Sequence, residues 1–479
     1  MFSHIFFVAS SNPKLLGSAL APERLLIVSL VELPSLPRRT SRREIFGWAM
    51  FDFANQAYTL LIITVVFGEL FTTVIVGERG DNYRFANFLW SLALALSSLM
   101  VVLTAPLCGA VMDYRAEKKR FLFLSYLATV ATTAMLYFVA PGYVMLGFLL
   151  IVLSNYAYSM GEAFIASFLP DLGPPEAMGK ISGFGWALGY IGGLFAAGFT
   201  LVALGETTAE NFERIRWVGP FAAGFFLVAA IPTFMWLKER GTPQPPGVHY
   251  RVIAKERVRT TLEDLRYFQD LGIFLVSLLF SMAGIYIIIS FAFIYGAQVI
   301  QWDGAIRNVM FIIVQITAAA GALGFGWIQD HLGAKLTYQI TLGLWVSSIL
   351  AIWATPQLTV LLNTYLDLTL EAQHVFLVVG CLAGASLGSS QSASRVLVGL
   401  FTPLPKAAEF FGFWGLANKL ASVFGIVMLG TLQAFIGLQA SILLCAALFI
   451  TAMLICTQVN ETRGRRAACA WKPQERSSN

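Results

Sequence analysis

The sequence is poor in charged residues. Only 12% of its 479 residues are Asp, Glu, Lys or Arg, whereas 57% are hydrophobic, and its mean hydropathy is +0.71. Soluble globular proteins carry about 25% charged residues. The composition therefore excludes a soluble protein and indicates a chain that lives in a lipid bilayer.

Several chemical signatures are also missing. The five cysteines include no CxxC pair, and the four histidines form no HExxH or clustered Cys/His pattern, which excludes a disulfide framework and a typical metal enzyme. Neither GxxxxGK[ST] nor a strand-bound GxGxxG is present. We therefore expect no metal and no cofactor, and the energy for any vectorial process would come from a proton or sodium gradient or from the substrate itself.

Twelve apolar runs of about 20 residues follow one another, and each is long enough to cross the hydrocarbon core of a bilayer. They are expected to be helices, because a lone strand in lipid would leave its backbone polar groups without partners. The sequence thus predicts an all-α membrane protein with spans at residues 46–75, 85–112, 120–140, 142–169, 180–204, 217–237, 271–297, 308–328, 336–354, 373–400, 407–431 and 435–458.

Lysine and arginine are distributed unevenly between the two sides of these spans. If the N-terminus is cytoplasmic, the outer loops hold only Arg79, Arg84, Arg214, Arg216 and Arg307. Basic residues gather on the cytoplasmic side of membrane proteins, so both termini are predicted to be cytoplasmic. The net charge of +5 is then explained by topology and not by binding to nucleic acid.

A polar break after the sixth span divides the chain into two halves. We expect a poorly ordered N-terminal tail, a first six-helix bundle, a cytoplasmic linker with one surface helix, a second six-helix bundle and a cytoplasmic tail. In that order, their predicted limits are residues 1–44, 45–237, 238–270, 271–458 and 459–479.

Two short sequences recur six spans apart. GAVMDYRAEKK after the second span and GWIQDHLGAK after the eighth contain two triplets with equal spacing, namely Gly109, Asp113 and Lys118, and Gly326, Asp330 and Lys335. SGFGWALGY in the fifth span similarly matches FFGFWGLANK in the eleventh. Two matches in one register indicate related halves, which is the layout of secondary transporters with a substrate site between the halves near the bilayer midplane.

Polar side chains line one face of three spans, because residues three, four and seven apart share a helix face. The sets are Asp52, Asn55, Gln56 and Thr59; Asn155, Tyr158, Ser159 and Glu162; and Gly388, Gln391, Ser392 and Arg395. An unpaired charge at the centre of a span costs about 2.5–3.5 kcal/mol on insertion scales. The charged members, together with Lys419 in the eleventh span, are therefore expected to face one another or a shared aqueous cavity.

These four charges carry the functional hypothesis. Lys419 or Arg395 would bind an anionic group of a solute, and Asp52 or Glu162 would receive an amino group or a proton. The alternative is a structural ion pair that only joins two spans. For the amide and hydroxyl groups on the same faces, the corresponding alternative is interhelical hydrogen bonding.

The sequence also resembles a known family. G-x-x-x-D-Y-R-x-x-K-K at 109–119 resembles the cytoplasmic signature of the major facilitator superfamily. Within that superfamily, the chain is similar from residue 41 to 458 to the vacuolar amino-acid effluxers associated with autophagy and to their bacterial relatives. The stretches that carry this similarity are FGWAMFDFANQAY (46–58), FLPDL (168–172), GWALGYIGG (185–193) and SSQSASR with PKAAEFFGF (389–413).

The resemblance implies a conformational gate. The aspartate of the signature would bond to a neighbouring helix terminus and to basic side chains, and so would latch one conformation. The predicted gate consists of Gly109, Asp113, Arg115, Lys118, Asp330 and Lys335. In the fifth span, a small-residue spacing that permits close and smooth helix packing is formed by Gly185, Gly189, Gly192 and Gly193.

From these features we expect a transporter that works by alternating access, and not an enzyme. Its substrate would be a small zwitterionic or anionic solute, with amino acids moved outward from the basic side. A cation-coupled sugar or glycoside symporter is the alternative within transporters, and a non-transporting receptor on the same scaffold is the alternative from another class. The short loops favour a bacterial inner membrane over a vacuolar membrane, and a monomer is possible.

Overall fold

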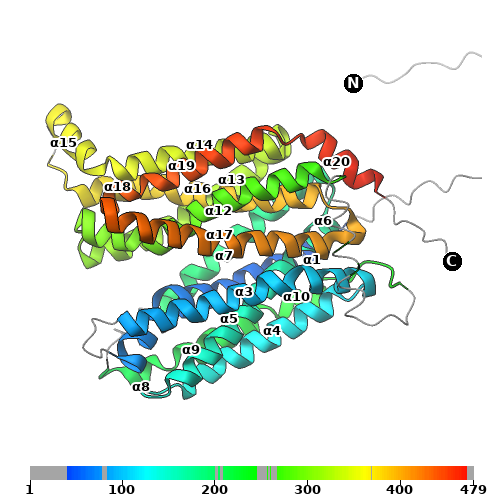
Figure 1. The fold of residues 1–479 in the computed structure, drawn as a ribbon, viewed down its shortest axis with the longest axis horizontal. Coiled ribbons are helices and arrows are strands. Elements are labelled where there is room, and N and C mark those ends of the chain that lie inside the picture. Colours follow the sequence, from blue (N-terminus) through cyan, green and yellow to red (C-terminus); the bar gives the residue numbers. More distant parts are fainter. Residues whose placement is uncertain are drawn as a thin grey trace, which may run out of the picture. The chain divides into compact units, whose positions relative to one another are not determined.

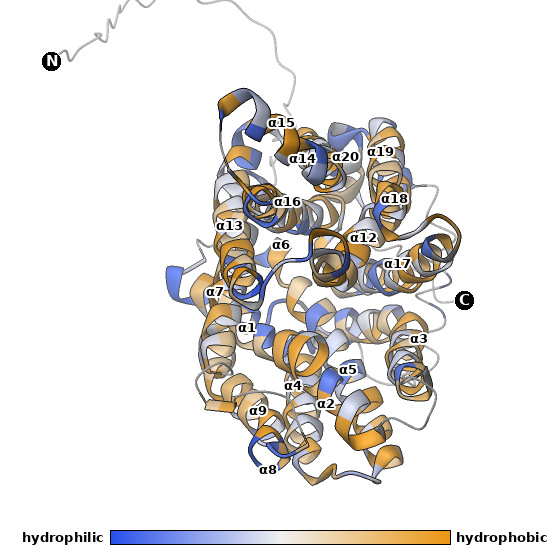
Figure 2. Cartoon of the chain, turned by 90° about the vertical axis from the view of Figure 1, so that its left-hand side faces the viewer, coloured by the Kyte–Doolittle hydropathy of each residue, from blue (hydrophilic) through white to orange (hydrophobic). Residues whose placement is uncertain are grey.

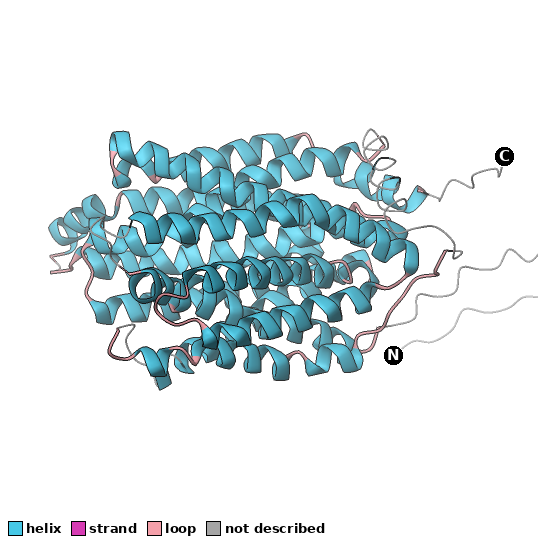
Figure 3. Cartoon of the chain, turned by 60° about the horizontal axis from the view of Figure 1, so that its bottom comes forward, coloured by secondary structure: helices cyan, strands magenta, loops and turns pink. Residues whose placement is uncertain are grey.

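In the computed structural model of the chain, the residues described are 40–77, 84–199, 203–204, 209–244, 256, 259, 267–367 and 369–471. Nearly all of these residues are helical, and none of them belongs to a strand (Figure 3). Twelve helical segments are long and apolar enough to cross a membrane. The predicted number and order of the spans are thereby confirmed.

The first six spans form the N-terminal half. Ser41 caps the first helix, its Oγ accepting a hydrogen bond of 3.2 Å from the Glu44 amide. The helices are α1 (Arg42–Ala57), which continues through two π-helical segments and α2 (Phe67–Leu70), then α3 (Arg84–Arg115), α4 (Lys118–Ala134), α5 (Val144–Ala166) with α6 (Leu169–Leu172), α7 (Met178–Phe199), α8 (Phe212–Ile215), α9 (Val218–Ala229) and α10 (Ile231–Trp236).

The C-terminal half repeats this plan and adds two helices that the sequence did not predict. The spans are α12 (Gln269–Tyr295), α13 (Gly304–Leu332), α14 (Ala334–Trp353), α16 (Ala372–Leu400), α17 (Ala407–Ile436) and α18 (Leu438–Ser441) with α19 (Leu443–Thr457). The added helices are α15 (Thr355–Leu366), which follows the ninth span, and α20 (Glu461–Ala470), which lies in the segment expected to be a tail.

The two halves pack as separate bundles that meet along a few helices. Figures 1 and 2 show α1, α3, α4, α5 and α9 below and α12 to α20 above, with α6 at the level of the upper helices. Contacts between the halves join α3 to α17, α7 to α13 and α16, and α5 to α17. We call the end of the bundle where α1, α7 and α17 begin the basic end, because the predicted inner lysines and arginines lie there, and the opposite end the far end.

Equivalent ion pairs at the basic end join the first span of each half to the segment that follows its last span. Glu44, at the start of α1, lies 2.8 Å from Arg240, which follows α10. Asp270, at the start of α12, lies 2.7 Å from Arg463 of α20. These matched contacts support the relation between the halves that the repeated sequences indicate.

Lys118 and Lys335, which occupy the same place in the two triplets, make different contacts. Lys335 donates through Nζ to the Thr457 carbonyl at 2.9 Å, at the end of the last span of its half. In the N-terminal half the matching contact is made by Lys119, which donates to the Leu237 carbonyl at 2.7 Å. Lys118 instead turns inward, towards Asp171 at 3.3 Å. Equal spacing therefore did not identify the residues with equal contacts.

Two other expectations concern the segments outside the spans. Helix α1 begins at Arg42, so the last residues assigned to the N-terminal tail are helical, whereas residues 1–39 lie outside the described residues. Most of the predicted linker lies outside them as well. Glu256 and Arg259 are helical, residues 269–270 already belong to α12, and the segment 238–244 is not helical. Burial raises the pKa of the Glu239 carboxyl in this part, against the opposing effect of the Lys119 amide.

Candidate functional site

A buried ion pair joins the two halves. Arg395 of α16 donates through Nη1 to Oδ2 of Asp52 on α1 at 2.8 Å. Only 3% of the Arg395 side chain and 13% of the Asp52 side chain are exposed. The structure thus brings together two of the four predicted charges, and it does so across the interface between the halves.

The other contacts of Arg395 also belong to the N-terminal half. Its Nε and Nη2 donate to the Oγ of Ser182, at 3.1 Å, and to the Ser182 carbonyl, at 2.9 Å. Its guanidinium lies over the rings of Trp48 and Trp186, 4.5 Å and 5.3 Å from their centroids, where a cation is attracted to the ring faces. We call these partners, Asp52, Trp48, Ser182 and Trp186, the Arg395 socket.

Two residues of the Arg395 socket were not predicted as site residues, although they lie in sequence stretches that were singled out. Trp48 and Ser182 lie in FGWAMFDFANQAY and SGFGWALGY, the stretches that carry the resemblance. A Cβ atom at Gly185 would lie 2.7 Å from Asp52 Oδ2 and 2.7 Å from Trp48. Gly185 therefore leaves room for the ion pair, in addition to the packing expected of it.

The remaining fifth-span glycines pack at two different surfaces. Gly189 and Gly192 face the backbone of α1 at Asp52 and Phe53, so they bring two helices of one half together. Gly193 faces the amide group of Gln315 on α13, in the other half.

Glu162 of α5 and Lys419 of α17 are the other two predicted charges, and they also come from different halves. Each acts electrostatically on the other, and the charges of Asp52 and Arg395 act on Glu162 as well. Within the described part of the chain, however, Lys419 makes no hydrogen bond, and no ion pair of 4.0 Å or less joins it to Glu162. Both side chains are only partly buried.

Aromatic hydroxyls surround Glu162. Tyr158 lies one turn before it, and its hydroxyl shares a hydrogen bond of 2.6 Å with Thr59 of α1. The ring of Tyr158 stacks on that of Tyr58 with 4.6 Å between centroids. Tyr286 of α12, which the sequence did not single out, interacts electrostatically with Glu162.

The other polar residues of the predicted site divide into two groups. Asn155 donates to Ser97 of α3 at 2.5 Å, an interhelical hydrogen bond within one half, which corresponds to the structural alternative. Gln391 accepts a hydrogen bond of 2.6 Å from Tyr190 of the other half. Asn55 Oδ1 and Ser392 Oγ are buried and make no hydrogen bond with the described residues.

The predicted gate residues meet helix N-termini at the basic end. Asp113 accepts from the amides of Ala408 and Glu409 at 3.0 and 2.8 Å, where α17 begins. Its side chain is only 1% exposed, and Lys118 lies 3.9 Å away. A carboxylate is favoured at a helix N-terminus by the exposed amides and by the helix dipole. The contacts that the resemblance implies for this aspartate are therefore present, and that they latch one conformation stays a prediction.

Asp330 makes the equivalent contact in the other direction. It accepts from the amides of Gly179 and Lys180 at 2.8 and 3.1 Å, where α7 begins. Nearby, a Cβ atom at Gly179 or Gly326 would collide with the facing backbone, so both glycines are needed for this approach. The two halves are thus closed against each other at the basic end.

Replacing Asp113 or Asp330 with asparagine should loosen the basic end and slow transport across the membrane. Hydrogen bonds to a charged group contribute about 1.5–3 kcal/mol, which corresponds to a shift of about 10- to 100-fold towards the open conformation. Ala322 of α13 is buried where this helix meets α7. The rate at which a thiol reagent modifies a cysteine introduced there measures this shift.

The matched control is Glu117→Gln, which removes an acid at the same end whose partner Arg120 is exposed. Exposed pairs contribute little, so its modification rate should stay within about twofold of the parent rate. Equal rates in the parent and in both aspartate variants would contradict the latch.

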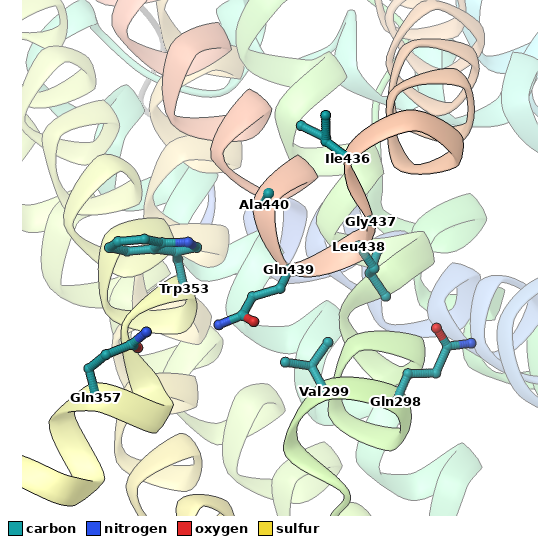
Figure 4. A pocket seen from close by; sticks show the side chains of 9 residues that line it. All are labelled: Gln298, Val299, Trp353, Gln357, Ile436, Gly437, Leu438, Gln439 and Ala440. Atoms are coloured by element: carbon teal, nitrogen blue, oxygen red, sulfur yellow. The ribbon is translucent and has the colours of Figure 1, made fainter.

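A shallow hollow of about 560 Å³ lies apart from these residues (Figure 4). It is formed by the far end of the C-terminal half alone. Gln357 and Gln439 point towards one another across it, and Trp353 borders it. None of the predicted site residues lines it. Among the described residues, no group of three or more His, Cys, Asp or Glu side chains is arranged to hold a metal ion.

Comparison with known proteins assigns the family. The profile of the family described as "Vacuole effluxer Atg22 like" matches residues 40–469. A Bacillus subtilis (strain 168) protein named "Uncharacterized MFS-type transporter YxiO" is 25% identical over 430 residues, which is 87% of this chain and 94% of the relative. "Autophagy-related protein 22-1" of Emericella nidulans is 21% identical over 304 residues, 61% of this chain and 51% of the relative.

A solved structure agrees with the fold. The proton:xylose symporter XylE, a protein of the major facilitator superfamily, superimposes with a TM-score of 0.65 at 15% identity, covering 90% of this chain and 99% of that chain. A likeness at this identity concerns the fold alone. With the profile match over most of its length, the chain belongs to the Atg22-like vacuole effluxer family and is a transporter of the major facilitator type.

Proposed function

We propose that this transporter moves a small zwitterionic solute, an amino acid, by alternating access and outward from the basic side. The observation that carries this proposal is the contrast between the two cations. Each guanidinium nitrogen of Arg395 donates a hydrogen bond to its socket, whereas Lys419 has no hydrogen bond or close ion pair among the described residues. Lys419 is therefore the cation that binds a carboxylate group of the solute.

Glu162 supplies the opposite charge. It lies on the other half of the molecule, within electrostatic range of Lys419 but not paired with it at 4.0 Å or less. An ammonium group at Glu162 and a carboxylate at Lys419 would allow one zwitterion to bind both halves at once. Each half would then contribute part of the binding energy, and release of the solute would accompany separation of the halves.

Three further points of the proposal rest at least partly on the family. Outward movement is supported by the name of the matching family, which describes effluxers. A bacterial inner membrane is supported by the Bacillus subtilis relative, 94% of which is matched. Amino acids as the solute class are supported by the sequence resemblance and by the unpaired acid and base.

The test is counterflow of a labelled amino-acid mixture into liposomes that contain the purified protein. The parent protein should show saturable counterflow, and Lys419→Ala should reduce it at least tenfold, because a hydrogen bond to a charged group is worth about 1.5–3 kcal/mol. Arg307→Ala, which removes an exposed cation near the far end, should leave counterflow within about twofold of the parent rate.

Two results would contradict the proposal. The first is parent-like counterflow by a folded Lys419→Ala variant, which would remove the lysine from the solute site. The second is counterflow of sugars and not of amino acids by the parent protein, which would favour the sugar symporter. Repeating the parent measurement with an imposed pH gradient determines whether protons are the coupling ion, because only a proton-coupled carrier would respond with net accumulation.

A further inference from the structure

Helix α15 is separate from the spans and lies crosswise to them. Its first residues include Pro356, which has no amide hydrogen to continue the hydrogen bonding of α14. Figure 2 looks along the spans and shows α15 from the side, and Figure 1 shows it at the far end, turned away from α14. Its 12 residues are too few to cross a bilayer.

The orientation of α15 is fixed by contacts along one of its faces, which carries Thr355, Thr359 and Asn363. Thr355 and Thr359 are buried on the face towards the protein. Asn363 of α15 forms two hydrogen bonds with Leu370, which lies beyond the end of the helix. It donates to the Leu370 carbonyl and accepts from the Leu370 amide, both at 2.9 Å. Asp367 adopts a left-handed conformation that ends the helix. These contacts hold the helix in one rotation about its axis.

That rotation leaves an apolar stripe uncovered. Leu358, Leu361, Leu362 and Tyr365 stand at i, i+3, i+4 and i+7, so they share one face. Leu361 is 51% exposed and Tyr365 is 80% exposed. The exposed edge beside the stripe carries Gln357, whose amide points into the hollow of Figure 4, and Thr364. Val360, which is 66% exposed, shares the side of Gln357 and Thr364. The exposed side is therefore largely apolar, with Gln357 and Thr364 as its polar residues.

The position of α15, directly after the end of α14, indicates what surrounds this stripe. Helix α14 has 20 residues and thus a length of about 30 Å, the thickness of a hydrocarbon core. Its last residue, Trp353, then lies at the edge of the bilayer, where tryptophan and tyrosine are enriched. Leu350 and Trp353 are exposed near the end of this span, and α15 follows directly after it.

We propose that α15 lies in the membrane interface at the far end, with Leu358, Leu361, Leu362 and Tyr365 inserted at the boundary between headgroups and acyl chains. The sequence TPQLTVLLNTYL contains no charged residue. Attraction to anionic headgroups therefore contributes nothing, and insertion depends on the apolar side chains alone. Under the predicted topology this is the outer leaflet. The helix would anchor the end of the ninth span at a fixed depth.

The test uses nitroxide labels in liposomes of neutral phosphatidylcholine. In a cysteine-free chain, a single cysteine replaces Leu361 or Tyr365 in the stripe, or Gln357 or Thr364 as controls on the same helix. Collisions of each label with oxygen, which concentrates in lipid, and with a water-soluble nickel complex are measured. We expect oxygen collisions to predominate at Leu361 and Tyr365 and nickel collisions to predominate at Gln357 and Thr364.

Two outcomes would overturn the proposal. Predominant nickel collisions at all four positions would place the stripe in water. Spin–spin broadening at Leu361 and Tyr365 that disappears on dilution with unlabelled protein would show that a second copy covers the stripe. If the cysteine-free chain does not fold, a bilayer-confined diazirine reagent applied to the native protein replaces the labels. It should modify Leu361 and Tyr365, and failure to modify either residue would equally overturn the proposal.

Discussion

Replacing Arg395 with alanine should abolish transport and lower the free energy of unfolding by about 3–5 kcal/mol, the usual effect of removing one partner of a buried ion pair. The substitution leaves the Asp52 carboxylate mostly buried without its cation. It also removes the group that lies over Trp48 and Trp186. Thermal unfolding in detergent and counterflow in liposomes measure the two effects.

Two further variants separate folding from transport. Arg395→Lys keeps the charge but cannot form the three directed hydrogen bonds of the guanidinium, so we expect a folded protein with counterflow reduced at least tenfold. Asp52→Asn combined with Arg395→Met removes both charges and should recover much of the lost stability without recovering counterflow. A stable Arg395→Ala protein with parent-like counterflow would show that the socket is dispensable.

The second large effect is expected at Gly183, where α7 meets α13. A Cβ atom at this position would overlap the Ala322 carbonyl oxygen and lie 3.3 Å from the Cα atom of Gly326. Gly183→Ala should therefore prevent the halves from closing at the basic end. Overpacking costs about 1–3 kcal/mol, so counterflow should fall about tenfold or more, while each half keeps its own core.

The matched control is Gly224→Ala, since a Cβ atom at Gly224 of α9 would meet nothing within 4 Å. Alanine favours helices over glycine by about 1 kcal/mol, and this effect is the same in both variants. A loss of counterflow that occurs in Gly183→Ala and not in Gly224→Ala therefore arises at the interface between the halves. Distances between spin labels on the two halves at the basic end should lengthen in Gly183→Ala only. Unchanged distances together with parent-like counterflow would contradict this prediction.

The spans could be predicted because their signal is local. Each of the twelve runs contains enough apolar residues to be recognised without knowledge of its neighbours. The faces of α1, α5 and α16 were predictable for the same reason, since the spacing of Asp52, Glu162 and Arg395 within each helix defines a face. Helices α15 and α20 were missed because neither contains an apolar run of the length that identifies a span.

The pairing between helices could not be predicted, because it depends on contacts between residues more than 200 positions apart. Lys419 and Arg395 were equivalent candidates for binding an anion. Only the structure shows that Ser182 and Asp52 occupy every nitrogen of the Arg395 guanidinium. The different contacts of Lys118 and Lys335 could not be predicted for a related reason, since the side chain of Lys118 turns towards Asp171.

The central claim is that one zwitterion binds between Glu162 and Lys419. Its most direct test is competition against counterflow of a labelled amino acid by three unlabelled compounds: the same amino acid, the amine that lacks its carboxylate, and the N-acetyl derivative that lacks its ammonium group. We predict that only the zwitterion competes strongly with the parent protein, and that Lys419→Ala removes the advantage of the amino acid over the amine. Equal competition by all three compounds, or competition by a sugar alone, would contradict the account.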